Sequence, residues 1–248
     1  MKTPIFFFLL LLIGCQNKPT NSEAVTELPV PQEIAMITND DTADERSLRT
    51  DTIYLSEDKN SSITHVLANL VDLKADQDSI MTSKFRLDFY QNKNKLISSK
   101  VVIKNYEKGS EWGGSIGLTN TSHKSSPFIQ LGFGYPACGY VHENYLYYFK
   151  NNSLQLVHQW NTMSDSGWGN WLEIVNPSND SDPKSFYCKT VAFVPADEDD
   201  NMDMGVLTHS DSIGFELKGN QWSKKLLSAK DKAYFQKKMT FDQFNSAE

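Results

Sequence analysis

The acidic run near residue 200 has the clearest metal-binding spacing in the chain. Four side chains with oxygen atoms stand at alternate positions: Asp197, Asp199, Asn201 and Asp203. This spacing is typical of Ca²⁺ ligands, but Met202 stands where a helix–loop–helix calcium site needs glycine, and Thr208 where it needs a bidentate glutamate. The run therefore predicts either another kind of calcium loop or a solvated acidic loop. The sequence indicates no other cofactor.

Aromatic residues close to glycines form a second candidate site. These residues are Trp112, Trp168, Trp171 and Tyr135. Aromatic rings in loops beside carboxylates can stack on sugar rings while polar groups bind the sugar hydroxyls. The alternative is that the tryptophans fill the ends of a β core, since tryptophan is usually largely buried.

Motifs for hydrolysis are present only in part. Ser115 lies in a G-x-S-x-G string, which needs a sharp turn between a strand and a helix, but the residues that follow are poor helix formers. Glu111 and Asp165 are candidates for a glycosidase acid pair, although nothing in the sequence brings them together. The sequence leaves open whether the chain is an enzyme and leans against it.

The first fifteen residues have the pattern of an export signal. Lys2 precedes the apolar run Ile5–Ile13, which is too short to span a bilayer and is typical of a signal peptide. The ending Leu12-Ile13-Gly14-Cys15 resembles the lipobox of bacterial lipoproteins. That resemblance implies removal of residues 1–14 and acylation of Cys15, with palmitate among the chains. Gln16 favours the outer membrane of a Gram-negative bacterium by the same resemblance.

The expected compartment permits disulfides. With Cys15 lipidated, Cys138 and Cys188 are the two remaining thiols, and we predict that they pair. A bridge across a loop of this length would stabilise the fold by about 4 kcal/mol. The alternative is two separate buried thiols.

Composition divides the exported chain into a tether and a body. Residues 15–50 are rich in proline, serine, threonine and acidic side chains, which predicts a lipidated, disordered tether. Residues 51–248 form the expected globular domain. A net charge of −7 argues against nucleic acid as a partner. The expected partners are the membrane, through the lipid, and a glycan or an envelope protein.

The body has the pattern of a β protein. Lys84–Tyr90 alternates between polar and apolar residues, and strand–turn–strand patterns recur around residues 92, 151 and 219. These features predict a mainly β fold, a single antiparallel β-sandwich or barrel-like domain, with a propeller-like repeat as the alternative. One or two short helices are also expected, at residues 62–70 and 228–238, since Ser62 and Ser228 are suitable caps.

These observations favour a lipid-anchored, extracytoplasmic β domain that serves as a binding or structural module for a glycan, a protein or an envelope component. The alternative is a lipid-anchored hydrolase of polysaccharide or ester substrates.

Overall fold

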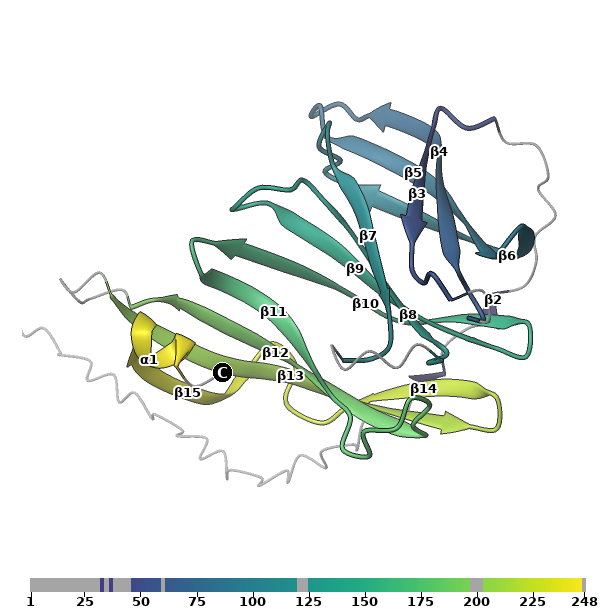
Figure 1. Ribbon diagram of the computed structural model, residues 1–248. Coiled ribbons are helices and arrows are strands. Elements are labelled where there is room, and N and C mark those ends of the chain that lie inside the picture. Colours follow the sequence, from purple (N-terminus) through teal and green to yellow (C-terminus); the bar gives the residue numbers. More distant parts are fainter. Residues whose placement is uncertain are drawn as a thin grey trace, which may run out of the picture.

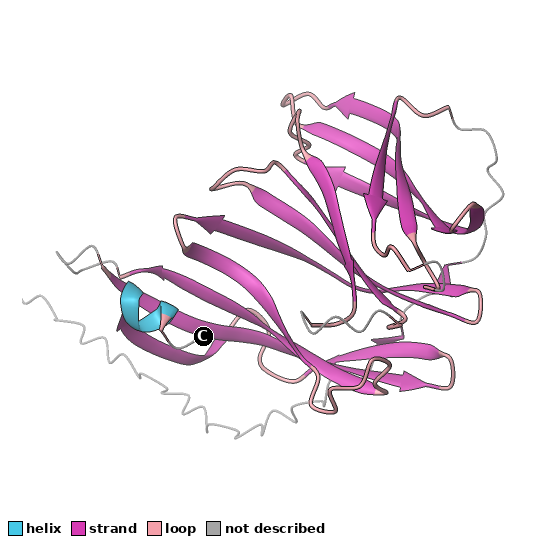
Figure 2. Cartoon of the chain, viewed as in Figure 1, coloured by secondary structure: helices cyan, strands magenta, loops and turns pink. Residues whose placement is uncertain are grey.

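The chain folds as a mainly β protein made of two antiparallel sheets (Figures 1 and 2). The computed structural model describes residues 46–58, 61–119, 125–196 and 203–246, and the backbone of residues 32–33 and 36–37. The larger sheet does not close into a barrel, and the described residues form no repeated blades. The predicted mainly β, sandwich-like fold is therefore confirmed.

The larger sheet contains eleven strands and the smaller one four. The smaller sheet comprises β3 (Arg49–Tyr54), β4 (His65–Ala75), β5 (Met81–Gln91) and β6 (Asn94–Lys104). The larger sheet comprises β1 (Gln32–Glu33), β2 (Met36–Ile37), β7 (Glu111–Ile116), β8 (Phe128–Gly134), β9 (Val141–Lys150), β10 (Ser153–Asp165), β11 (Trp168–Val175), β12 (Ser185–Pro195), β13 (Met204–Lys218), β14 (Gln221–Leu226) and β15 (Ala233–Thr240).

The strand order follows the chain closely. The smaller sheet has the order β3-β4-β5-β6, and the larger runs from β7 to β14 in sequence order, with β1 at the far edge of β14. Two further strands add at the sides, because β15 pairs with β13 and β2 pairs with β10. In Figure 1 the smaller sheet lies over the β7–β10 end of the larger sheet, whereas β15 lies toward its other end.

All three predicted hairpins are confirmed: β5–β6, β9–β10 and β13–β14. Each has a two-residue turn, for example Asn151-Asn152 between the paired residues Lys150 and Ser153. Both turn residues have positive φ, at 53° and 57°. A type I′ turn requires this conformation, and asparagine adopts it more readily than most residues, so the local sequence selects the hairpin.

Strand β9 is covered on both faces, which joins the two parts of the core. Its five residues from Tyr145 to Phe149 are all buried. Tyr145, Tyr147 and Phe149 point into a core shared with the smaller sheet, while Leu146 and Tyr148 point into a second core on the other face. Because side chains alternate along a strand, one continuous apolar run serves both cores.

The two cores differ in their partners. The first lies between the sheets and includes Phe85, Leu87 and Phe89 of β5. The second is formed within the larger sheet by residues of β8–β10 and β12–β14, and Trp222 at its centre has no solvent exposure. Both cores draw on strands far apart in the sequence.

The two predicted helices are wrong. Residues 65–70 belong to β4 and residues 233–238 to β15, because their backbone groups pair with neighbouring strands. The one helix in the described residues, α1 (Phe241–Asn245), starts at Thr240. The Thr240 hydroxyl accepts from the Gln243 amide at 3.2 Å, and the Gln243 side chain accepts from the Thr240 amide at 3.0 Å. This capping box is a local signal that the sequence carried.

Two short strands lie in the segment expected to be a tether. Gln32–Glu33 pairs with β14, and Met36–Ile37 pairs with β10, so these residues add to the larger sheet. Across the described residues, no helix combines the length and the apolar composition that a bilayer span needs.

Candidate binding site

The connection between β8 and β9, residues 135–140, separates two cavities on the larger sheet. Its backbone is held in place by three hydrogen bonds. The Gly139 amide donates to the Ser164 carbonyl at 2.9 Å, the Ala137 amide donates to the Tyr135 carbonyl at 2.8 Å, and the His142 Nε2 atom lies 2.9 Å from the Tyr135 carbonyl oxygen. Gly139 has φ +81°, a left-handed conformation that glycine adopts without strain. The 135–140 loop is thus a fixed element of the site.

The first cavity, which we call the inter-sheet cleft, lies between the end of β6 and strands β8–β10. Its volume is about 760 Å³, within the range of small-molecule sites. Its polar side chains are Lys104, Asn105, Glu107, Ser110, Glu143, Gln159 and Asn161. Its rings are those of Phe133, Tyr135 and Tyr140. The cleft thus combines hydrogen-bonding groups with aromatic surface.

Glu143 is the most firmly placed of the polar groups. Its Oε2 atom accepts from the Tyr145 hydroxyl at 2.7 Å and more weakly from the Gln159 amide at 3.4 Å. Burial, followed by this contact with Glu143, raises the pKa of Tyr145 above its ordinary value, so the phenol keeps its proton and donates. The carboxylate is therefore oriented from beneath, with its other oxygen free of partners within the described residues.

Asn161 and Glu107 offer further groups to a ligand. Both are exposed, and neither side chain has a hydrogen bond or ion pair in the described part of the chain. A ligand that enters the cleft therefore meets the Asn161 amide, the Glu107 carboxylate and the second carboxylate oxygen of Glu143, none of which has a partner within the described residues.

Tyr135 and Tyr140 form an aromatic pair at the 135–140 loop. Their ring centroids lie 4.7 Å apart, tilted by 42°, and Tyr140 is 40% exposed. The ring of Tyr135 rests against Gly109, where a Cβ atom would lie 3.0 Å from its Cε2 atom. Glycine at position 109 thus leaves the space that this ring occupies.

The second cavity, the loop-side pocket, lies on the other side of the 135–140 loop and has a volume of about 620 Å³. It is lined by loop residues and by His142, Thr162, Ser164, Asn170 and Trp171. Tyr140 lines this pocket as well as the inter-sheet cleft. No carboxylate, lysine or arginine lines it.

The predicted aromatic residues do not form one site. Trp112 packs between the sheets, 4.8 Å from the Phe133 ring, and Trp168 stacks on Phe193 at 4.7 Å. Trp112 thus packs against the first core, whereas Trp168 belongs to neither core. Tyr135 lies in the inter-sheet cleft and Trp171 in the loop-side pocket.

The predicted disulfide between Cys138 and Cys188 is wrong. Cys138 is exposed in the 135–140 loop, whereas Cys188 has no solvent exposure and lies in the second core. A side chain of β12 that points into a core does not meet a thiol on the surface of a loop. Burial raises the pKa of the Cys188 thiol to about 12, so it stays protonated and unreactive.

The predicted calcium ligands Asp197, Asp199 and Asn201 lie outside the described residues. Asp203 is described, and its backbone carbonyl accepts from the Phe241 amide at 2.8 Å. The described residues contain no group of three or more acidic, histidine or cysteine side chains placed to hold a metal. The calcium loop stays a prediction, which calorimetry with millimolar calcium tests.

The hydrolase candidates are not brought together. Ser115 lies within β7, an edge strand, and not on a turn between a strand and a helix. Glu111 and Asp165 line neither the inter-sheet cleft nor the loop-side pocket. Since a nucleophile needs a base within hydrogen-bond reach, the geometry gives no support to these residues as catalysts.

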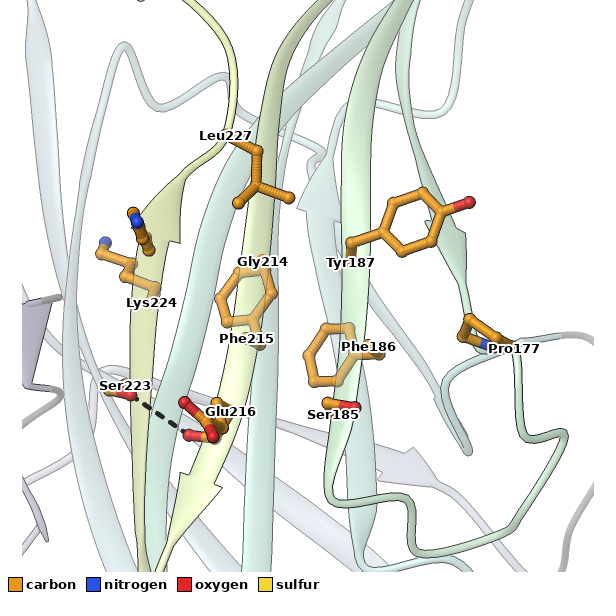
Figure 3. A pocket seen from close by; sticks show the side chains of 11 residues that line it. Pro177, Ser185, Phe186, Tyr187, Gly214, Phe215, Glu216, Ser223, Lys224 and Leu227 are labelled. Atoms are coloured by element: carbon orange, nitrogen blue, oxygen red, sulfur yellow. Dashed lines mark hydrogen bonds between the residues drawn. The ribbon is translucent and has the colours of Figure 1, made fainter. Parts of the chain in front are cut away.

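A third cavity is a shallow groove over β12–β14, of about 380 Å³ (Figure 3). Tyr187, Leu227 and Pro177 form its apolar walls around Gly214. Two of its polar groups have partners within the chain, because Ser223 donates to the Glu216 carbonyl at 3.3 Å and the Glu216 carboxylate pairs with Lys218 at 3.1 Å. Unlike the inter-sheet cleft, this groove therefore offers a ligand no carboxylate without a salt bridge.

Sequence reasoning missed most of the cleft. Glu143, Gln159 and Asn161 come from two paired strands, and Lys104 and Glu107 come from the end of β6 and the turn after it. The sequence did indicate the β9–β10 hairpin, and the register of that hairpin places Glu143 directly opposite Asn161. No local pattern indicated that β6 would end beside them.

Comparison with known proteins gives no match: no family model, no curated protein and no solved structure is similar to this chain.

Proposed function

We propose that this chain is a bacterial lipoprotein, anchored in the outer membrane through a lipid on Cys15, whose β domain binds a glycan in the inter-sheet cleft. The observation that carries the proposal is the Tyr135–Tyr140 pair beside Glu143 and Asn161. A sugar ring has apolar C–H faces and a rim of hydroxyls, and the cleft holds the matching aromatic and polar groups side by side.

The state of the polar groups supports a hydroxyl-rich ligand. Glu143 is already oriented by Tyr145, so a ligand hydroxyl that donates to its free oxygen loses little affinity to ordering of the carboxylate. Asn161 supplies both a donor and an acceptor. An apolar ligand would leave these groups without partners, which costs free energy.

The binding test uses calorimetry with the full chain in detergent and a panel of neutral and amino-sugar oligosaccharides. At least one glycan is expected to bind. Glu143→Gln is expected to weaken binding about tenfold, since hydrogen bonds to charged groups contribute about 1.5–3 kcal/mol. Glu216→Gln, a strand carboxylate outside the cleft, is the matched control. Equal affinities for the two variants would contradict the assignment of the cleft.

The anchor is tested separately by expression in a Gram-negative host with a palmitate analogue that carries a label. The label is expected on the wild type and on Cys138→Ser, but not on Cys15→Ser, because the lipobox resemblance assigns the acyl chains to Cys15. Label on Cys15→Ser would refute the anchor without affecting the glycan site.

A further inference from the structure

We propose that the outer face of the β5–β6 hairpin is a second binding surface, which takes a linear anionic polysaccharide. The outer face is the one that points away from the larger sheet. It carries four cations, which we call the basic track: Lys84 and Arg86 on β5, and Lys95 and Lys100 on β6. None of the four lines the inter-sheet cleft, so this proposal does not depend on the function proposed above.

The strand register places the basic track on a single face. The side chains of β5 that point into the first core are Phe85, Leu87 and Phe89. Because side chains alternate along a strand, Lys84 and Arg86 point the other way, as does Tyr90. Directly paired residues of antiparallel strands lie on the same face. Arg86 pairs with Lys100, and Tyr90 pairs with Lys95, so the cations of both strands share the outer face.

Positive charge is concentrated on this hairpin, although the chain as a whole is acidic. Residues 84–100 contain five lysine or arginine side chains and one carboxylate, which gives a local charge of +4 in a chain whose net charge is −7. At physiological ionic strength, exposed charges more than about 8 Å apart are largely screened. A ligand that lies on the track therefore responds to the local positive charge.

The one carboxylate in this segment orients the cations from beneath. Asp88 is 5% exposed, and its oxygens lie 3.2 Å from the Arg86 Nε atom and 3.3 Å from the Lys95 Nζ atom. Arg86 is largely buried, whereas Lys95 keeps 47% of its side chain exposed and Lys84 keeps 52%. The cations are thus held in place before a ligand binds, which lowers the cost of ordering them.

The track is narrow, which favours a linear ligand over a flat surface. Its cations lie on two adjacent strands, β5 and β6, at one edge of the smaller sheet. The outward residues at the opposite edge, on β3, are uncharged: Thr50, Thr52 and Tyr54. A flat anionic surface would cover the uncharged edge as well, whereas a single extended chain can follow the hairpin alone.

The spacing of the track favours a polysaccharide over a nucleic acid. At about 3.4 Å per residue, Lys95 and Lys100 lie roughly 14–17 Å apart along β6. A nucleic acid strand carries a charge about every 3.4 Å, whereas an acidic polysaccharide carries its charges on separate sugar units and has a lower charge density. The ring beside Lys95, that of Tyr90, stacks on His65 at a centroid distance of 5.0 Å, so one of its faces is already covered and cannot stack on a base.

The test measures binding of the full chain in detergent to two pairs of polymers: polygalacturonate with its methyl ester, and dextran sulfate with dextran. The members of a pair share a backbone and differ in charge. At least one acidic polymer is expected to bind about tenfold or more tightly than its neutral partner. Because the contacts are between exposed charges, binding is expected to weaken as the salt concentration rises.

The variants locate the surface. Lys95→Gln and Lys100→Gln together are expected to weaken binding of the acidic polymer about tenfold, since they remove two charge contacts. Glutamine at position 95 keeps a donor for Asp88, and an unchanged urea midpoint checks that the sheet is intact. Lys230→Gln and Lys232→Gln together, which remove two exposed lysines outside the hairpin, are the matched control and are expected to leave the affinity unchanged.

Three outcomes overturn the proposal. The first is no binding of either acidic polymer, or equal affinity for the acidic and neutral members of each pair. The second is an equal loss of affinity in the two double variants, which would mean that the hairpin is not the surface. The third is tighter binding of a single-stranded oligodeoxynucleotide than of both acidic polymers, which would assign the track to nucleic acid. Glu143→Gln is expected to leave polymer binding unchanged, so failure here does not affect the glycan site in the cleft.

Discussion

Asp88 offers the sharpest test of how the smaller sheet is held together. Its side chain is 5% exposed and lies on the outer side of the sheet, where it accepts from Asn69 at 2.9 Å and from Ser98 at 2.6 Å. Arg86 lies 3.2 Å from both of its carboxylate oxygens, and Lys95 lies 3.3 Å from one. A single carboxylate thus satisfies donors from three adjacent strands.

Replacement of this carboxylate removes the ion pairs with Arg86 and Lys95 and the hydrogen bonds from Asn69 and Ser98. Loss of one member of a buried ion pair costs about 3–5 kcal/mol. The Lys95 side chain is 47% exposed and regains water, so we expect Asp88→Ala to cost about 3 kcal/mol, at the lower end of that range. Asp88→Asn keeps the shape and part of the hydrogen bonding, so a smaller loss is expected.

The assay is urea denaturation followed by tryptophan fluorescence. With a slope of about 3 kcal/mol/M, the expected loss for Asp88→Ala lowers the midpoint by about 1 M. The matched control is Glu216→Ala, which removes a strand carboxylate whose ion pair with Lys218 is exposed on both sides. Such pairs contribute about 0–1 kcal/mol. If the two variants shift the midpoint equally, the Asp88 network does not stabilise the sheet as its geometry indicates.

Three further predictions address the second core and the C-terminal end. Burial, followed by the charge of Lys224, lowers the pKa of His158 from 6.5 to about 4. The stability that neutral His158 provides is therefore complete above pH 6.5, and about 3 kcal/mol of it is lost as the pH falls toward 4. The urea midpoint of His158→Phe should lack this part of the pH dependence. If its midpoint varies with pH as the wild type's does, His158 is not the group responsible. In the Cys15→Ser protein, a thiol reagent should label Cys138 in the native state and Cys188 only in denaturant, whereas no labelling before reduction would indicate a disulfide. The Phe244 ring stacks on Phe193 at a centroid distance of 4.4 Å. Phe244→Ala should therefore lower the free energy of unfolding by about 1 kcal/mol or more in the same urea assay. No change would mean that α1 does not stabilise the sheet.

The parts of the fold that depend on neighbouring residues could be predicted from the sequence. Alternation along Lys84–Tyr90 and the Asn151-Asn152 turn gave the strands and hairpins, because turn conformation and strand period are set within a few residues. The same local reasoning was wrong for residues 62–70. Their apolar spacing also suits a helix, but β4 forms because β3 and β5 pair with it on both sides.

The cysteines show the limit of reasoning from composition. An expected oxidising compartment and two thiols predicted a bridge, but pairing requires that both side chains reach the same place. The register of β12 directs Cys188 into the second core, while the 135–140 loop holds Cys138 at the surface. Only the tertiary structure decides which thiols can meet.

By itself, the sequence determined the mainly β class, the three hairpins and the lipobox-like start that leads us to propose a lipid anchor, since each is written in adjacent residues. Which residues meet in the inter-sheet cleft depends on the tertiary structure. Lys104 and Glu107 reach Glu143 and Asn161 only because the smaller sheet packs across β9 of the larger one. That packing depends on burial of apolar faces distant in sequence, which no local pattern specifies.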